Sequence, residues 1–287
     1  MPKNSAVIDT HFHIWDLKKF DYVWPNSDRE LEKVYRNFMP DDYLREMADT
    51  EITNSIFVEA HESLEETRWV LQLAEQYDFI KGVVGFVDLT SDDVEEQIKK
   101  FKENRKLVGV RKVLDLSDEG WIERDDVMRG IDALARHNLT YDLLIRTRDQ
   151  YESAKKFLER APPSLKIIID HLGKPNAKTG ADEQWYEDMS FYASYKNVYC
   201  KLSGMVTEGN LNDWKPSDFK KHVDYVIEKF GTDRVMFGSD WPVCKLANAN
   251  LSDVYELLKG LLSDLSEKDR EKVLRLNAIK AYNLAIH

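Results

Sequence analysis

The chain has 287 residues, and its 52 acidic and 41 basic side chains give a formal net charge of −11. An acidic balance of this size argues against a surface that binds nucleic acid or an anionic membrane. No apolar run reaches the ~18 residues that a membrane span needs, and the N-terminal residues lack the charged-then-apolar layout of a signal peptide. Cys200 and Cys244 follow apolar runs and form no Cys-x-x-Cys motif, so we expect buried free thiols and a cytoplasmic location.

Strand-like and helix-like segments alternate along the chain. The residue patterns predict strands at 6–11, 53–59, 81–88, 107–113, 139–145, 166–171, 197–202 and 234–238. They predict helices from Pro40 onward and at 63–77, 91–104, 125–138, 149–160, 182–193, 216–230, 251–264 and 267–285. Ser63 and Glu66 stand at capping-box spacing. Longer loops are expected at 14–39 and near 203–215, and loops of such length tend to be functional.

This alternation predicts a parallel sheet with helices on its faces. The run Ile167–Ile169 is typical of a strand that is buried on both sides. Eight strand–helix units in fewer than 300 residues fit one (β/α)8 TIM barrel, a single domain over residues 1–287 with an extra helix at the C-terminus. An open doubly wound sheet is the alternative, less favoured because no Gly-x-Gly-x-x-Gly loop follows the first strand.

Polar residues stand where the predicted strands end, which is where (β/α)8 barrels carry their active sites. The first strand ends in His11 and His13, and alternation along a strand points both side chains the same way. Two imidazoles directed into one space suit a divalent metal. The later strands end in or carry Glu59, Arg111, His171 and Asp240. The barrel is expected to bring all of these residues to one mouth.

Each of these residues also has a plainer interpretation when taken alone. The histidine pair could lie in a loop and bind nothing, Asp240 could cap a helix, and Glu59 could be a solvated loop acid. Alternation predicts that His171 shares a face with Ile167 and Ile169, although it could be an ordinary polar residue at a strand end. The active-site interpretation is favoured because the strand-end rule selects the same few residues from the whole chain.

The chain also resembles the amidohydrolase superfamily, and most closely the branch that contains sugar-lactone and 2-pyrone-4,6-dicarboxylate lactonases. The resemblance rests on four segments in the expected order, Asp9-Thr10-His11-Phe12-His13-Ile14-Trp15-Asp16, Asp170-His171-Leu172-Gly173-Lys174-Pro175, Lys201-Leu202-Ser203-Gly204 and Phe237-Gly238-Ser239-Asp240-Trp241-Pro242. It implies a distorted (β/α)8 barrel with His11, His13 and Asp240 at the metal or carbonyl-polarising position.

Two features depart from the two-metal pattern of the superfamily. The fourth strand offers Arg111 where two-metal members usually present a lysine or a glutamate, and the fifth strand has no histidine. The resemblance therefore implies one divalent ion, with zinc as the first candidate, or a metal-independent lactonase. Glu59 is kept as a further candidate ligand.

The resemblance implies hydrolysis of a small lactone of a sugar acid, such as a fucono- or rhamnono-lactone. Asp240 is expected to act as general base toward water, while His11 and His13, with or without an ion, polarise the carbonyl. His171 is expected to orient the carbonyl or to protonate the departing ring oxygen. The candidates for substrate binding are Arg111, Lys174 and an aromatic wall of Trp15, Trp24 and Trp241, for which ordinary packing is the alternative.

Two other functions stay open at this point. One is a metal-dependent decarboxylase of the same fold, and the other is a non-catalytic binding barrel. The expected partner is a small-molecule lactone, without nucleic acid or membrane, and the oligomeric state is left open, a homodimer included.

Overall fold

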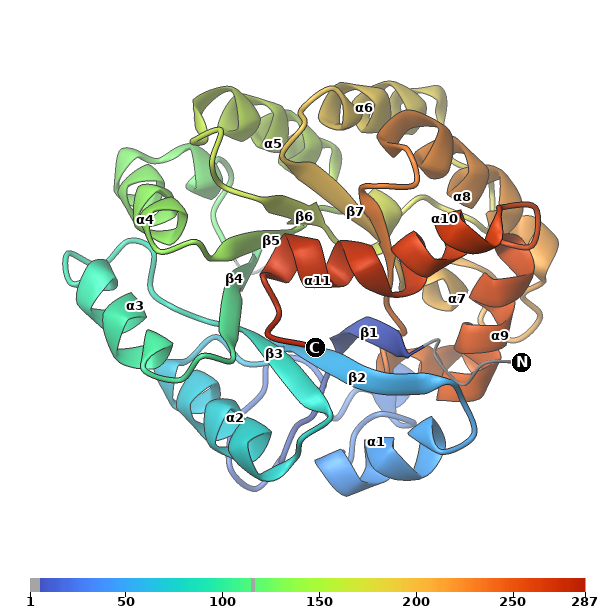
Figure 1. Cartoon of the computed structure of the whole chain (residues 1–287), viewed down its shortest axis with the longest axis horizontal. Coiled ribbons are helices and arrows are strands. Elements are labelled where there is room, and N and C mark those ends of the chain that lie inside the picture. Colours follow the sequence, from blue (N-terminus) through green and yellow to red (C-terminus); the bar gives the residue numbers. More distant parts are fainter. Residues whose placement is uncertain (1–5, 115–116, 287) are drawn as a thin grey trace.

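Eight parallel strands form the centre of the molecule in the computed structural model, which describes residues 6–114 and 117–286. The strands are β1 (Val7–Phe12), β2 (Ile52–Val58), β3 (Ile80–Gly85), β4 (Leu107–Val113), β5 (Thr140–Leu144), β6 (Ile167–Ile169), β7 (Val198–Leu202) and β8 (Val235–Phe237). They lie side by side in chain order, each parallel to the next. The predicted (β/α)8 barrel is confirmed (Figure 1).

Backbone contacts just beyond β8 close the ring onto β1. The amide of Asp240 donates to the carbonyl of His11 at 2.8 Å, and the amide of His13 donates to the carbonyl of Trp241 at 2.7 Å. These bonds hold the end of the first strand against the segment that follows the last one. Residues 229 and 228 positions apart in sequence therefore meet at one point of the mouth.

Helices surround the barrel, as Figure 1 shows. Those between strands are α1 (Pro40–Met47), α2 (Leu64–Gln76), α3 (Val94–Lys102), α4 (Asp125–Arg136), α5 (Arg148–Arg160), α6 (Glu183–Ala193), α7 (Met205–Glu208) and α8 (Pro216–Phe230). After β8 come α9 (Leu251–Leu261), α10 (Glu267–Glu271), a π-helical turn (Lys272–Leu276) and α11 (Asn277–Tyr282). The predicted helix at 267–285 is thus interrupted by the π turn, and α7 lies within the predicted loop near 203–215. No helix among the described residues is long and apolar enough to cross a membrane.

The apolar interior has two parts. A large cluster fills the space between strands and helices, and a smaller one occupies the inside of the barrel. The smaller cluster combines strand residues such as Ile8, Val84 and Met236 with Ala281 and Tyr282 of α11. Figure 1 shows α11 lying across the ring of strands. The C-terminal helix therefore closes one end of the barrel, and the mouth lies at the other end.

Glu66 forms only half of the predicted capping box, and its side chain holds the loop after β2 instead. The Ser63 hydroxyl accepts from the Glu66 amide at 3.1 Å, which is the expected half of the box. The Glu66 carboxylate instead accepts from the amides of Ala60 and His61, at 3.0 and 2.9 Å. It therefore fixes the loop that follows Glu59 at the mouth.

Candidate active site

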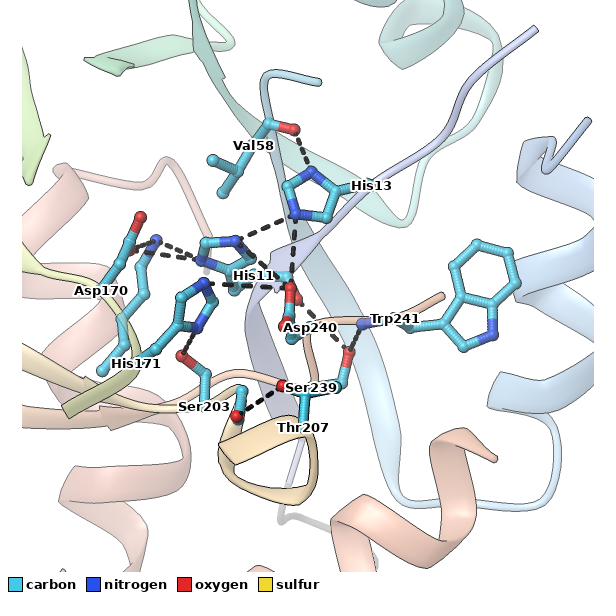
Figure 2. Close-up of polar contacts among 12 residues, drawn as sticks. His11, His13, Val58, Asp170, His171, Ser203, Thr207, Ser239, Asp240 and Trp241 are labelled. Atoms are coloured by element: carbon cyan, nitrogen blue, oxygen red, sulfur yellow. Dashed lines mark hydrogen bonds and ion pairs between the residues drawn. The ribbon is translucent and has the colours of Figure 1, made fainter. Parts of the chain in front are cut away.

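Three side chains converge at the mouth of the barrel (Figure 2). The Nε2 atoms of His11 and His13 are 3.2 Å apart, and Asp240 Oδ1 lies 3.8 Å from the first and 3.4 Å from the second. All three residues are buried. Two imidazole nitrogens and one carboxylate oxygen at this spacing form a donor set typical of zinc.

The outer ring nitrogens of both histidines have partners that orient them. His13 Nδ1 lies 2.8 Å from the carbonyl oxygen of Val58, which can only accept, so this nitrogen carries the proton and Nε2 presents its lone pair. His11 Nδ1 lies 3.3 Å from Asp170 Oδ1. Burial, together with the nearby charge of Lys201, holds the pKa of His11 well below its usual range. Both rings therefore suit a metal ligand.

Asp240 stands just after β8, in a left-handed backbone conformation with φ of 57°. Burial alone would raise the pKa of its carboxyl group, but His171 and a hydrogen bond from His13 hold it well below the usual range. The carboxylate is therefore ionised near neutral pH. The carboxylate of Asp240 faces the histidines, and not the start of a helix as the alternative interpretation had it.

His171 reaches the mouth by a backbone turn, and not by strand alternation. Strand β6 ends at Ile169, and His171 has φ of 54°. The predicted shared face with Ile167 and Ile169 is wrong, because these two lie in the outer core cluster. His171 Nε2 lies 4.0 Å from Asp240 Oδ1, and burial lowers the pKa of His171 to about 3.

A serine and a glycine of the loop after β7 hold the His171 ring in place. The Nδ1 atom of His171 lies 2.8 Å from the Ser203 hydroxyl. Gly204 has φ of 61°, and a Cβ atom at this position would lie 2.6 Å from Nδ1. The loop can approach the ring this closely only because residue 204 is glycine.

Arg111 is paired with two buried carboxylates. Its Nε lies 2.9 Å from Glu59 Oε1, its Nη1 lies 3.2 Å from Asp170 Oδ2 and its Nη2 donates to the Glu59 carbonyl. Nη1 also lies 3.3 Å from His11 Nε2. Both negative partners of Arg111 therefore come from the chain itself, and its expected role in binding substrate stays a prediction.

Glu59 is buried, so the solvated-loop interpretation is wrong. Among the described residues, the groups with metal-ligand spacing are His11–His13–Asp240 and His11–Asp170–His171, and Glu59 belongs to neither. Its carboxylate serves as the partner of Arg111. Burial raises the pKa of Glu59, while the charge of Arg111 opposes the shift.

A cavity of about 600 Å³ lies above these groups. His13, His171, Asp240, Arg111, Trp24 and Lys174 are among its lining residues. Lys174 Nζ lies 2.8 Å from Glu208 Oε1 on α7. Trp24 comes from the loop at 14–39, which also packs Phe20 on His61 with ring centroids 5.4 Å apart.

The predicted aromatic wall is only partly present. Trp15 and Trp241 are fully buried and lie outside the cavity lining. The indole nitrogen of Trp15 donates to the Arg36 carbonyl at 2.7 Å, and the ring of Trp15 lies against that of Trp24, with centroids 5.7 Å apart. The packing alternative is therefore right for Trp15 and Trp241, and Trp24 is the member that reaches the cavity.

The protein-family comparison matches an amidohydrolase model to residues 8–284. This chain belongs to the amidohydrolase family. It is 36% identical to the L-fucono-1,5-lactonase of Burkholderia ambifaria over 84% of this chain and 81% of that protein. It is 32% identical to the L-fucono-1,5-lactonase of Burkholderia multivorans over 96% of each. A crystal structure of an amidohydrolase from Burkholderia multivorans with bound zinc has 30% identity and a TM-score of 0.89, covering 97% of this chain and 99% of that one. The predicted branch of the superfamily is confirmed.

This amidohydrolase also has a buried ionic network that the sequence reasoning did not find. Lys201 Nζ on β7 lies 2.6 Å from Asp142 Oδ2 on β5 and 3.0 Å from Asp170 Oδ1. All three residues are fully buried. In the sequence, Lys201 and Asp170 stand out only as parts of the motifs that carry the family resemblance. The available signal was a charged residue inside an apolar strand, because such a group must find a partner when buried.

Proposed function

We propose that this amidohydrolase opens the lactone ring of a sugar acid, with a fucono-1,5-lactone as the first candidate and a rhamnono-lactone as the next. The observation that carries the proposal is an ionised Asp240 beside the paired His11 and His13 at the floor of a cavity of about 600 Å³. The two relatives named L-fucono-1,5-lactonase support the choice of substrate class.

His11, His13 and Asp240 would hold one divalent ion, zinc by their donor set, and its chemistry there is Lewis-acid polarisation of a carbonyl and acidification of water. Asp240 accepts a proton from the attacking water, since its carboxylate is kept ionised by His171 and His13. The water oxygen adds to the lactone carbonyl carbon, and the bond between that carbon and the ring oxygen then breaks.

His171 delivers a proton to the departing ring oxygen. The neutral His171 ring donates from Nδ1 to the Ser203 hydroxyl and presents the lone pair of Nε2, which lies 4.0 Å from Asp240. Asp240 passes the proton taken from water to this nitrogen, and His171 then delivers that proton to the ring oxygen. The sum of these steps is one water consumed and one hydroxy acid formed.

The walls of the cavity favour an uncharged ring. Trp24 and Lys174 line the cavity. Trp24 would pack its indole face on the C–H side of a sugar, and Lys174, which also donates to Glu208, would donate to a substrate hydroxyl group. Arg111, which lines the same cavity, is already paired with Glu59 and Asp170. We therefore expect neutral aldonolactones to be better substrates than pyrone dicarboxylates.

The test is a pH-indicator assay over aldonolactones and dicarboxylate lactones, with and without a chelator. Asp240→Asn should lower kcat at least about 100-fold, the lower end of general acid–base contributions. Asp132→Asn is the matched control, because Asp132 is exposed on α4. Turnover by Asp240→Asn near the wild-type rate would refute the assignment of the base.

Adding β-keto and vinyl acids to this panel, with CO2 release and ligand binding as further readouts, separates the two alternatives. Release of CO2 from a β-keto or vinyl acid, together with inert lactones, would favour the decarboxylase. Saturable ligand binding without turnover of any compound would favour the binding barrel.

A further inference from the structure

A continuous column of buried polar groups runs from the closed end of the barrel to its mouth. The hydroxyl of Tyr282 on α11 donates to Asp142 Oδ2 at 2.8 Å. The same oxygen lies 2.6 Å from Lys201 Nζ, and Lys201 Nζ lies 3.0 Å from Asp170 Oδ1. Asp170 Oδ1 in turn lies 3.3 Å from His11 Nδ1. The C-terminal helix is thereby linked to the first histidine of the active site.

Lys201 is the central member of this column. Its side chain is fully buried, and its Nζ lies within 3.1 Å of Asp142, Asp170 and His11. Asp170 is held from both sides, because Lys201 contacts Oδ1 and Arg111 contacts Oδ2. A carboxylate fixed by two cations cannot rotate away from the ring that it faces without leaving a buried charge unpaired.

The orientation of Asp170 decides how His11 presents its two nitrogens. The Asp170 carboxylate, 3.3 Å from Nδ1, can only accept, and Arg111 Nη1, 3.3 Å from Nε2, can only donate. Both contacts favour the proton of the neutral ring on Nδ1, against the opposing contact of Lys201 Nζ at 3.1 Å from the same atom. The lone pair of Nε2 then points toward His13 and Asp240, which lie 3.2 and 3.8 Å away. If Asp170 moved, the ring could carry its proton on Nε2 instead and could no longer serve as a ligand or carbonyl-polarising group there.

We infer that Lys201 is a positioning residue, which holds Asp170 against His11 Nδ1 and so keeps the Nε2 lone pair of His11 directed at the cavity. Tyr282 and Asp142 hold Lys201 in turn, and α11 contributes to the site although Tyr282 lies outside the cavity lining. The inference rests on the proposed function only in taking His11 as a metal ligand or carbonyl-polarising residue of the site.

Two variants weaken the column without leaving an unpaired charge. Tyr282→Phe removes one hydroxyl and keeps the ring. The double variant Lys201→Met with Asp142→Asn removes one positive and one negative charge together. Tyr255→Phe is the matched control, because Tyr255 is also a buried tyrosine whose hydroxyl donates to a carboxylate, that of Glu51, and it has no part in the column.

The first measurement is the histidine tautomer in metal-free protein, from long-range 1H–15N spectra of the imidazole rings. A His11→Gln sample identifies the His11 signals. Wild-type protein and Tyr255→Phe should show His11 protonated on Nδ1. The double variant should lose this tautomer as the dominant form, and Tyr282→Phe should show a mixture.

The second measurement is zinc affinity, from competition with a chromophoric chelator. The Kd should rise about 10- to 100-fold in the double variant, the range found when a partner of a metal ligand is lost. Tyr282→Phe should raise it by about 3- to 10-fold, the effect of about one hydrogen bond. Tyr255→Phe should leave the Kd unchanged.

An unchanged His11 tautomer in both column variants would overturn the inference, as would shifts in Tyr255→Phe as large as theirs. If the double variant does not fold, Tyr282→Phe decides by the same two readouts. Neither readout uses a lactone, so the proposed function can fail in the hydrolysis assay while this inference stands, and the reverse also holds.

Discussion

Replacing Arg111 by methionine should destabilise the protein strongly at neutral pH. The guanidinium group is almost fully buried and lies 2.9 Å from Glu59 and 3.2 Å from Asp170, both of which are fully buried. Breaking a buried pair by removing one partner costs about 3–5 kcal/mol, because the other charge is left uncompensated. Lys201 still contacts Asp170 in the variant, so most of this cost falls on Glu59.

The loss of unfolding free energy in Arg111→Met should grow as the pH rises. Burial already raises the pKa of Glu59, and the variant lacks the opposing charge of Arg111. A group whose pKa is higher in the folded than in the unfolded state favours folding at low pH, and this contribution is lost as the pH rises through the folded pKa. Arg111→Met should therefore differ least from wild type near pH 4, and the difference should grow above the ordinary glutamate pKa of about 4.3.

The assay is urea unfolding followed by circular dichroism at several pH values. Adding Glu59→Gln to Arg111→Met removes the uncompensated charge and should restore at least about half of the loss at pH 7. Arg124→Met is the matched control, since Arg124 pairs with Asp126 at the exposed surface and such pairs contribute about 0–1 kcal/mol. A loss below about 1 kcal/mol in Arg111→Met, or no recovery in the double variant, would refute the reasoning.

Three further predictions concern the cavity and its floor. Gly204→Ala should lower kcat by at least about 10-fold, because the added Cβ would lie 2.6 Å from His171 Nδ1. Gly231→Ala is the control, since Gly231 has a similar φ but no atom within 4 Å of the added Cβ, and it should show only a modest loss of stability in thermal unfolding. Trp24→Ala should raise KM about 10-fold with a small change in kcat, because Trp24 lines the cavity. Trp241→Ala should instead lower the free energy of unfolding by about 3–5 kcal/mol, because Trp241 is fully buried outside the cavity lining. Equal effects of the two variants on KM would contradict this difference in placement. Incubation with a strong chelator should lower both Tm and turnover, and zinc should restore both, which calorimetry and the indicator assay can follow.

The architecture could be predicted from sequence because its signals are local. Strand and helix patterns alternate along the chain, and the observed strands fall within about three residues of the predicted ones. The strand-end rule also located His11, His13, His171 and Asp240. For these residues, knowing where a strand ends is sufficient to place the side chain at the mouth.

The remaining features depend on contacts that a single sequence does not encode locally. The pairing of Lys201 with Asp142 follows from the positions of β5 and β7 around the ring. The path of His171 follows from a positive φ after a strand of only three residues, and alternation cannot describe such a turn. Whether a tryptophan beside the site faces the cavity or the core is decided by the irregular segment at 14–39, where no periodicity is available.

The loop at 14–39 and the floor of the cavity are built by different parts of the chain. The floor is fixed by strands and by the buried column behind them, whereas Trp24 is supported by side chains such as Trp15 and by the packing of Phe20 on His61. We therefore expect substitutions around Trp24 to change which ring fits with little effect on Asp240, whereas Trp15 and Phe38, at the two ends of the loop, pack against His13 and Trp241. Such a division would let selectivity be redesigned by exchanging the residues around Trp24 while the two packed ends of the loop are kept.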